Sequence, residues 1–218
     1  MGGGQTLPRV TRSCLRRSTH TLPQVLAAEH GTHHLVTADA AGNVVSLTTT
    51  VNRIFGSQLT TRHGVVLNDE LDDFTQTKQL GELGLTRNPN RARPGARPVS
   101  SMSPTIVTRG DQAVFALGGS GGMAIATNVT QVLFGRLVFN LQPQALVSAP
   151  RFFVPPAGPT IFVAEDASQN LIADLESRGE VVRQMTWDDT TAVQVLMRDG
   201  AAVLAAADPR KFGVGLTQ

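Results

Sequence analysis

Residues 31–52 read GTHHLVTADAAGNVVSLTTTVN, and this stretch determines which fold the chain can adopt. Residues 34–38 and 44–51 are rich in β-branched side chains, which favour strands. Between them, residues 39–43 combine Asp, Gly and Asn, the residue types that form tight turns. The stretch therefore predicts an antiparallel hairpin with Thr32 at its free end.

Strand-like and helical segments alternate along the rest of the chain. Short β-branched runs predict strands at residues 64–68, 103–108, 113–117, 193–197 and 202–206. Apolar residues at a helical period predict helices at residues 123–139, 142–147 and 169–177. A polar loop at residues 75–97 is long enough to suggest a functional segment. Hairpins interleaved with helices indicate a layered α/β or α+β domain.

The composition is that of a folded globular protein, with 41% hydrophobic and 17% charged residues in a chain of 218 residues. The formal net charge is only +2, and no aromatic residues alternate with the Arg clusters, so nucleic-acid binding is not predicted. No apolar run reaches 18 residues, so no membrane span is predicted. The single cysteine, Cys14, leaves no internal disulfide.

Residues 1–31 differ from the rest of the chain because they are rich in Gly, Arg and Thr and show little periodicity. We expect them to form a mostly irregular leader, and residues 32–218 to form the folded domain. Basic residues near the start are not followed by an apolar stretch, so the leader is not predicted to be a secretion signal. The compartment of the protein stays unknown at this stage.

The loop Gly118–Gly122 satisfies the G-x-S-x-G pattern of hydrolase nucleophiles and lies between an expected strand and an expected helix. That fold requires an acid and then a His after the Ser, and all the His residues precede Ser120. Ser120 is therefore not expected to be a nucleophile. Backbone N–H groups that enter a helix can instead form an oxyanion site. A tight turn without chemistry is an equally good interpretation.

Two further groups of polar residues are ambiguous. His30, His33 and His34 lack the spacing of a zinc motif, and adjacent strand residues point to opposite faces, so no metal site is predicted. The acidic run that contains Glu70 and Asp73 is compatible with a solvated loop, a metal site or a site for an ammonium group. The residue types alone do not choose among these.

Several blocks between Thr32 and the C-terminus, read together, resemble the small, C-terminal, catalytic subunit of the γ-glutamyltransferases (glutathione hydrolases), within the N-terminal-nucleophile (Ntn) hydrolase superfamily. The most specific blocks are NDELDDF at residues 68–74 and PVSSMSPT at residues 98–105. Other matching blocks follow the family order at residues 31–35, 42–52, 118–122, 149–151 and 207–211. The resemblance implies an α+β fold, namely the part of a four-layer αββα sandwich that the small subunit contributes.

The resemblance assigns catalytic roles to four residues. Thr32 corresponds to the family's nucleophile, and Thr50 would hydrogen-bond to it and help to set its reactivity. Gly121 and Gly122 would form the oxyanion hole, which would resolve the ambiguity of the glycine-rich loop.

Five more residues correspond to the family's substrate-binding positions. Asn52, Glu70 and Asp73 would hold the α-amino and α-carboxylate ends of a γ-glutamyl group, the two acids pairing with the ammonium. Ser100 and Ser101 would bind the α-carboxylate. The resemblance thus implies a γ-glutamyl amide such as glutathione as substrate.

The implied chemistry is consistent with the residue types. A Thr hydroxyl is a weak nucleophile and needs a base. A free α-amino group, with an unperturbed pKa of about 7.7–8.0, can accept the proton at neutral pH. Cleavage of the Gly31–Thr32 bond would expose that group on Thr32, so we expect autocatalytic cleavage there. The acyl group would then pass to water or to an amino-acid or peptide acceptor, without a metal or another cofactor.

The resemblance also implies a partner, the large N-terminal subunit of the same precursor, with residues 1–31 as the remnant of its C-terminus. Family members are often periplasmic or extracellular. Two alternatives remain open. The chain could be another amide hydrolase of the superfamily, similar to the cephalosporin acylases, or a non-catalytic fragment that lacks its large subunit.

Overall fold

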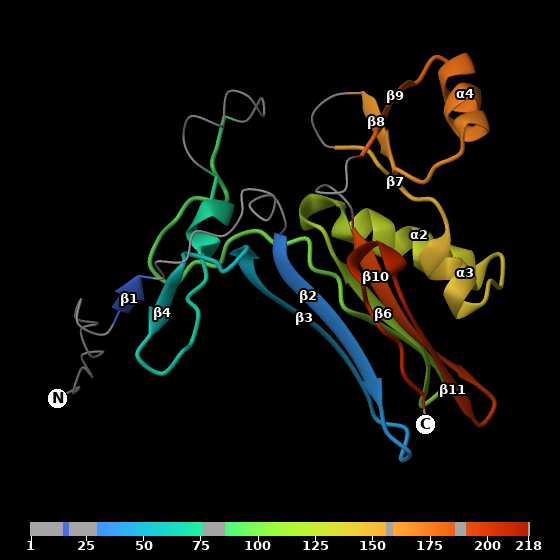
Figure 1. Cartoon of the computed structure of the whole chain (residues 1–218), viewed down its shortest axis with the longest axis horizontal. Coiled ribbons are helices and arrows are strands. Elements are labelled where there is room, and N and C mark those ends of the chain that lie inside the picture. Colours follow the sequence, from blue (N-terminus) through green and yellow to red (C-terminus); the bar gives the residue numbers. More distant parts are fainter. Residues whose placement is uncertain (1–14, 18–29, 76–85, 156–158, 186–190, 218) are drawn as a thin grey trace.

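The computed structural model describes residues 15–17, 30–75, 86–155, 159–185 and 191–217 (Figure 1). The strands are β1 (Leu15–Arg17), β2 (His30–Ala38), β3 (Val44–Arg53), β4 (Leu59–Thr61), β5 (Thr105–Arg109), β6 (Gln112–Ser120), β7 (Phe152–Phe153), β8 (Thr160–Val163), β9 (Val181–Gln184), β10 (Ala192–Asp199) and β11 (Ala202–Ala207). The α-helices are α2 (Ile125–Leu137), α3 (Pro143–Ser148) and α4 (Gln169–Ser177). Short 3-10 helices are η3 (Glu70–Asp73), η4 (Gly122–Ala124) and η6 (Pro209–Lys211).

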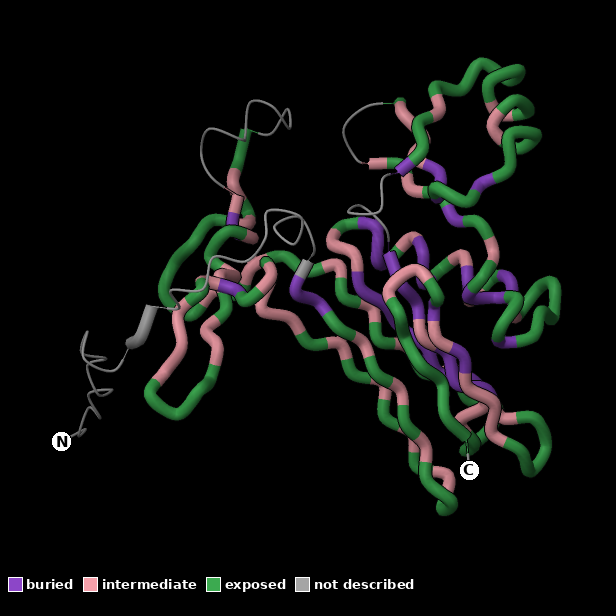
Figure 2. The backbone as a smooth tube through the Cα atoms, in the orientation of Figure 1, coloured by how far each residue is buried: buried purple, intermediate pink, exposed green. Residues whose placement is uncertain are grey.

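The main core lies between an antiparallel sheet and two helices. Strands β11, β10, β6 and β5 form the sheet in that order, and α2 and α3 pack on one of its faces (Figure 1). Figure 2 shows the buried residues concentrated between these two layers. The core cluster contains Phe115, Leu117, Ile125, Val129, Val132, Leu146, Val147, Val193, Val195, Met197 and Ala206. Alternate residues of β6 and β10 enter this core because successive side chains of a strand point to opposite faces.

The β2–β3 hairpin packs against the opposite face of the sheet, chiefly on β6 (Figure 1). Side chains of β3 alternate between half-buried and exposed, as expected for a strand that covers a sheet with one face. Ser46 Oγ donates to the Leu117 carbonyl of β6 at 3.0 Å, which ties the hairpin to the sheet. The described residues therefore form three successive layers, namely helices, sheet and hairpin.

A smaller unit follows α3 in the chain. Strand β7 pairs antiparallel with β8, and β8 pairs parallel with β9 through the crossover helix α4. Ser168 caps α4 by accepting a hydrogen bond from the Leu171 N–H at 3.3 Å. Gly179, with φ of 87°, follows this helix as the sequence predicts.

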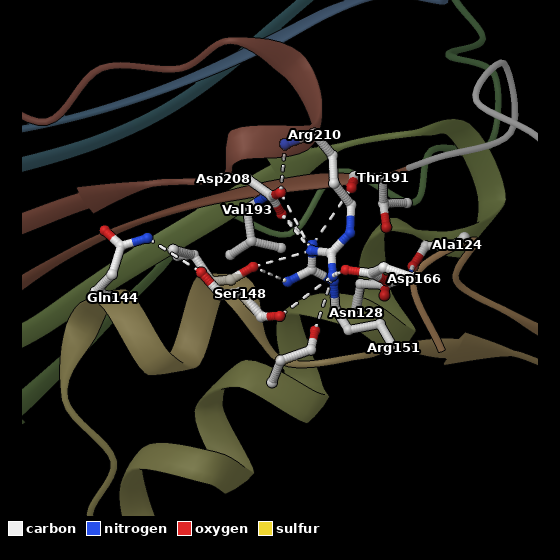
Figure 3. Close-up of polar contacts among 12 residues, drawn as sticks. Ala124, Asn128, Gln144, Ser148, Arg151, Asp166, Thr191, Val193, Asp208 and Arg210 are labelled. Atoms are coloured by element: carbon white, nitrogen blue, oxygen red, sulfur yellow. Dashed lines mark hydrogen bonds and ion pairs between the residues drawn. The ribbon is translucent and has the colours of Figure 1, made fainter. Parts of the chain in front are cut away.

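A buried ionic cluster fastens the segment after β11 to the helices (Figure 3). Arg151 and Asp208 form a salt bridge in which both side chains are almost completely buried. Arg210 also bonds Asp208, and its guanidinium donates to the Val147 carbonyl at the C-terminal end of α3 at 2.9 Å. Asp208 in turn accepts from the backbone N–H of Val193 at 3.1 Å. One carboxylate thus joins β10, α3 and the C-terminal segment.

The structure confirms most of the expected elements. The hairpin at β2–β3, strands β5, β6, β10 and β11, and helices α2, α3 and α4 lie where the sequence predicts them, with boundaries that differ by a few residues. The described part of the 75–97 loop contains neither helix nor strand. Among the described residues, no helix combines the length and the apolar character that crossing a membrane requires.

Four expectations were wrong or incomplete. Residues 64–68 do not form a strand, because only Val66 makes an isolated bridge, to Thr60 of β4. Gly118–Ser120 do not belong to a turn, because they pair with β10 as the end of β6. The sequence analysis also missed β7, β8 and β9, which are only two to four residues long and carry little periodicity. In the expected irregular leader, β1 pairs with β4, and residues 1–14 and 18–29 lie outside the described residues.

Candidate active site

Thr32 lies in β2 directly opposite Thr50 of β3, on the inner face of the hairpin. Only 9% of its surface is exposed. The two hydroxyl oxygens, Thr32 Oγ1 and Thr50 Oγ1, are 2.8 Å apart and hydrogen-bonded. Residues that lie opposite each other on one face of an antiparallel pair are close enough to interact directly. The hairpin register therefore brings together the two hydroxyl groups that the sequence assigned to catalysis.

A β-bulge lies beside this pair. Thr32 pairs with Thr50, whereas His30 pairs with Arg53, so β3 carries one more residue than β2 across this interval. Asn52, within the bulge, has φ of 70°, which Asn tolerates better than most residues with a side chain. This conformation lets the Asn52 backbone N–H donate to Thr50 Oγ1 at 2.8 Å. Bulges that aim a side chain or a backbone group are common next to active sites.

The bulge also explains why residue 31 is a glycine. A Cβ atom on Gly31 would lie 2.9 Å from Cγ2 of Val51, and the carbonyl of Arg53 would be closer still. A side chain at position 31 would therefore push the bulge away from β2. The peptide bond that precedes Thr32 is packed against β3 without room for a larger residue.

The backbone hydrogen bond to Thr50 leaves the Thr50 hydroxyl free to act as the donor in the Thr32–Thr50 pair. Thr50 Oγ1 accepts from the Asn52 N–H, so its own hydrogen is available for Thr32 Oγ1. A hydroxyl that accepts a hydrogen bond is also a stronger donor. This arrangement would stabilise negative charge on the Thr32 oxygen during a nucleophilic attack.

The acidic residues of η3 are fastened to the end of β3 next to the bulge. Asn52 Nδ2 donates to the Asp69 carbonyl at 3.4 Å, and the Arg53 N–H donates to Asp69 Oδ1 at 3.1 Å. Glu70 and Asp73 follow within the single turn of η3. Asn52, Glu70 and Asp73, which the sequence analysis assigned to the α-amino and α-carboxylate ends of a substrate, thus lie around one loop.

Burial, followed by a hydrogen bond and charge repulsion from Asp73, raises the pKa of Glu70 to about 7. Asp69 contributes further repulsion to this rise in pKa. Within the described part of the chain, Glu70 Oε1 is buried and has no hydrogen-bond partner. A pair of close acids with an unsatisfied oxygen is suited to a cationic group, because a positive charge relieves their repulsion.

The segment that carries Ser100 and Ser101 is joined to the turn formed by Gly121 and Gly122. Ser101 Oγ donates to the Gly122 carbonyl at 2.5 Å, whereas the exposed Ser100 accepts from the Met102 N–H at 3.2 Å through Oγ. Gly121 and Gly122 have φ of 128° and 57°, and a Cβ on Gly121 would lie within 3 Å of Thr191. Glycine is required at this turn for both conformation and space.

Thr32 and the residue directly before the Gly121–Gly122 turn line a common cleft. Ser120, the last residue of β6, and Thr32 both line a cleft of about 1280 Å³ between β2 and the sheet. The turn leads through η4 into α2, so its N–H groups lie at the positive end of a helical segment. Such a position is suited to an oxyanion.

Asn90 is a structural residue that the sequence analysis missed. Its Nδ2 donates to the Asp73 carbonyl at 2.7 Å, and its Oδ1 accepts from the Val99 N–H at 2.9 Å. Asn90 therefore joins the acidic turn to the segment that carries Ser100 and Ser101. No motif or spacing marked it, because it lies in a polar loop with several similar residues.

His34 was considered only as a metal ligand. Within the described residues, no group of three or more His, Cys, Asp or Glu side chains is placed to hold a metal ion. His34 instead lies between the hairpin and β6, where burial lowers the pKa of its imidazole to about 4. The side chain is therefore neutral at physiological pH.

Comparison with solved structures defines the class of protein. The chain aligns with γ-glutamyltranspeptidase from Pseudomonas nitroreducens complexed with L-DON at a TM-score of 0.76 and 34% identity, over 85% of this chain and 98% of that chain. The α+β arrangement is thus the Ntn-hydrolase fold, in the portion that one chain of such an enzyme contributes. The expected fold class is confirmed.

The family follows from the sequence comparisons. The family profile described as Gamma-glutamyltranspeptidase matches residues 9–217, and the chain belongs to this family. Glutathione hydrolase 2 of Arabidopsis thaliana is 35% identical over 203 residues, which are 85% of this chain and 35% of that protein. A second Arabidopsis thaliana protein, named Putative inactive glutathione hydrolase 4, is 41% identical over 57% of this chain and 68% of its own length. The chain thus spans about a third of the length of the first relative.

Proposed function

We propose that this chain is the catalytic part of a γ-glutamyl hydrolase or transferase, which acts on glutathione and related γ-glutamyl amides through Thr32. The observation that carries the proposal is the 2.8 Å contact between Thr32 Oγ1 and Thr50 Oγ1, beside a glycine-restricted peptide bond, in a member of this family. The domain boundary between residues 31 and 32 is part of the same proposal.

In the first step the Thr32 hydroxyl attacks the Gly31 carbonyl carbon, the C–N bond breaks as the nitrogen takes the hydroxyl proton, and water hydrolyses the resulting ester to a Gly31 carboxylate and a free Thr32 hydroxyl. Cleavage releases the Thr32 α-amino group, which then takes the hydroxyl proton when Thr32 attacks the γ-carbonyl carbon of a substrate. The donated hydrogen bond of Thr50 supports the developing charge on the attacking oxygen. The amine or peptide leaves with a proton, and water or an amino acid then accepts the γ-glutamyl group from the ester on Thr32.

The remaining residues bind the substrate and the transition state. Backbone N–H groups of Gly121 and Gly122 stabilise the oxyanion, and a single such donor contributes about 3 kcal/mol in well-studied enzymes. Asn52, Glu70 and Asp73 hold the α-amino and α-carboxylate ends of the γ-glutamyl group, and the two acids pair with the ammonium. Ser100 and Ser101 hold the α-carboxylate. The hydrogen bonds through Asp69, Asn90 and Ser101 support this assignment because they join these groups into one rim.

The test is intact-mass analysis with N-terminal sequencing of the purified chain, alone and co-expressed with a large subunit. We expect a product that begins at Thr32 and hydrolyses a chromogenic γ-glutamyl anilide, and we expect Thr32→Ala to abolish both properties. Ser120→Ala is the matched control, because Ser120 is the rival nucleophile of the G-x-S-x-G pattern, and it should still be cut. An uncut wild-type chain under both conditions would contradict the proposal.

A large subunit is the proposed partner. The chain spans 98% of the solved Pseudomonas nitroreducens chain but 35% of Glutathione hydrolase 2, which supports a precursor divided into two chains. The outer face of the β2–β3 hairpin also exposes Leu35, Val45 and Leu47, each by more than 40%. Exposed apolar faces of this kind commonly mark interaction surfaces. Leu47→Lys should weaken co-purification with the large subunit.

A non-catalytic role is the second candidate. One observation favours it, namely the Arabidopsis thaliana relative named Putative inactive glutathione hydrolase 4, which is 41% identical over 57% of this chain. Under this alternative, the chain would bind a large subunit without cleavage at residue 31. The mass analysis separates the two candidates, because only the catalytic one yields a new N-terminal Thr.

A further inference from the structure

His34 fills the space between the hairpin and the sheet at one point of closest approach. An ideal Cβ on Gly118 of β6 would lie 2.6 Å from each nitrogen of the His34 imidazole. The ring therefore rests directly on the backbone of β6, and only glycine at position 118 permits this contact. Any change in the size of either residue must alter the separation of the two layers.

Hydrogen bonds lock the imidazole in this position. Ser46 Oγ donates its hydrogen to the Leu117 carbonyl, so toward the His34 Nε2 at 3.4 Å it can only accept. Nε2 therefore carries the ring hydrogen. Nδ1 then accepts from the Thr48 hydroxyl, which lies 2.8 Å away. Burial, which lowers the pKa of His34 to about 4, keeps the ring in this neutral form.

The contact lies close to both halves of the proposed catalytic centre. Thr32 is two residues from His34 along β2, and Gly121, which directly follows the end of β6, is three residues from Gly118. At the usual strand rise these separations are about 7 and about 10 Å. Thr32 and Ser120 line the same cleft, so both strands lead from the contact toward the same end of the molecule.

We propose that His34 is a positioning residue, whose contact with Gly118 sets the distance between the Thr32 nucleophile and the oxyanion turn at Gly121 and Gly122. The inference rests on the proposed function and adds a residue to it that touches neither substrate nor reacting atoms. Nucleophile and oxyanion donors lie on different layers, so their spacing depends on what separates the layers. A misplacement of about 1 Å can lower a catalytic rate by about 100-fold.

A double-mutant cycle tests the proposal. Gly118→Ala places a methyl group in the ring position, and His34→Ala removes the ring, so each change alone should lower kcat by about 10-fold or more with little change in KM. In the double variant the new methyl group occupies the vacated space. The kcat of the double variant should therefore be about fivefold or more above the value expected if the losses of the two single variants multiplied.

The control is Gly135→Ala in α2, where a Cβ would lie 2.9 Å from Cδ2 of Leu146, far along the chain from the site. It measures the effect of overpacking alone, and we expect a lower melting temperature with kcat near that of the wild type. Circular dichroism and thermal unfolding of each variant separate misfolding from misplacement. Multiplicative effects in the double variant, or an unchanged kcat in Gly118→Ala, would overturn the proposal.

The rate of cleavage at Gly31–Thr32 is a second readout, because it needs Thr32 but no γ-glutamyl substrate. If the wild type cleaves itself but does not hydrolyse a γ-glutamyl anilide, the substrate assignment fails while the cycle still tests His34 through the cleavage rate. If the effects of His34→Ala and Gly118→Ala on the cleavage rate do not multiply in the double variant, the positioning role is supported. A wild type that does neither, with or without a large subunit, overturns both proposals.

Discussion

Glu70 carries its proton close to neutral pH, and this sets how the proposed site binds a cation. Since burial and Asp73 raise its pKa to about 7, Glu70 is largely neutral below pH 7 and charged above it. An α-ammonium group is attracted more strongly to the charged form. We therefore expect the affinity for L-glutamate, the acyl product, to rise with pH through about 7 and to level off about one pH unit above that value. Calorimetric titration between pH 5.5 and 8.5 measures this directly.

Glu70→Gln is the corresponding variant, and its affinity should be lower and nearly independent of pH across this window. The raised pKa of Glu70 also makes the stability of the folded state depend on pH. A raised carboxyl pKa favours the folded state below the unfolded pKa of about 4.3, and this contribution is lost as pH rises through 7. Glu70→Gln should thus be more stable than the wild type above pH 7. An unchanged pH dependence of binding would show that Glu70 does not face the ligand.

Asn52 offers a second prediction at the residue scale, because its backbone and side chain have separate roles. Asn52→Gly keeps access to φ of 70°, whereas Asn52→Ala disfavours it by about 1 kcal/mol or more. Both variants lose the side chain, so both should bind glutamate weakly. Self-cleavage, followed by mass spectrometry, should be about fivefold slower or more in Asn52→Ala than in Asn52→Gly. Equal cleavage rates would mean that the bulge does not orient Thr50.

At the scale of elements, the proposed nucleophile lies on a paired strand, whereas the proposed substrate-binding residues lie on loops that are fastened to one another. Asn90 joins the acidic turn to the serine segment. In Asn90→Ala both bonds are lost, so we expect KM for a γ-glutamyl anilide to rise by about 5- to 20-fold, with self-cleavage unaffected. Steady-state kinetics on the cleaved enzyme measures KM.

Asn88→Ala is the matched control for Asn90→Ala. Asn88 lies in the same loop and donates to the Thr75 carbonyl at 2.7 Å instead. Its KM should remain within about twofold of the wild type, because surface-loop changes away from such links have small effects. Equal changes in both variants would point to general loosening of the loop.

At the scale of the whole molecule, the buried Arg151–Asp208 pair holds the C-terminal segment onto the helices (Figure 3). Arg151→Ala removes one partner of a buried pair and should destabilise the chain by about 3 kcal/mol, as measured by urea unfolding. Arg178→Ala breaks an exposed pair with Asp174 on α4 and should cost about 0.5 kcal/mol or less. A similar loss in both variants would contradict a structural role for the cluster.

The hairpin, the helices and the candidate residues could be predicted from the sequence, because these depend on local periodicity and on short blocks of characteristic residues. Thr32, Thr50 and the acidic run were found for this reason, and the β2–β3 register then places Thr32 and Thr50 together. The positions of Gly118 and Ser120 could not be predicted in this way, because pairing with β10, a strand distant in sequence, competes with turn formation and prevails. Likewise, His34 and Asn90 derive their importance from partners 12 to 14 residues away or farther in β3, β6 and η3, to which local sequence patterns are insensitive.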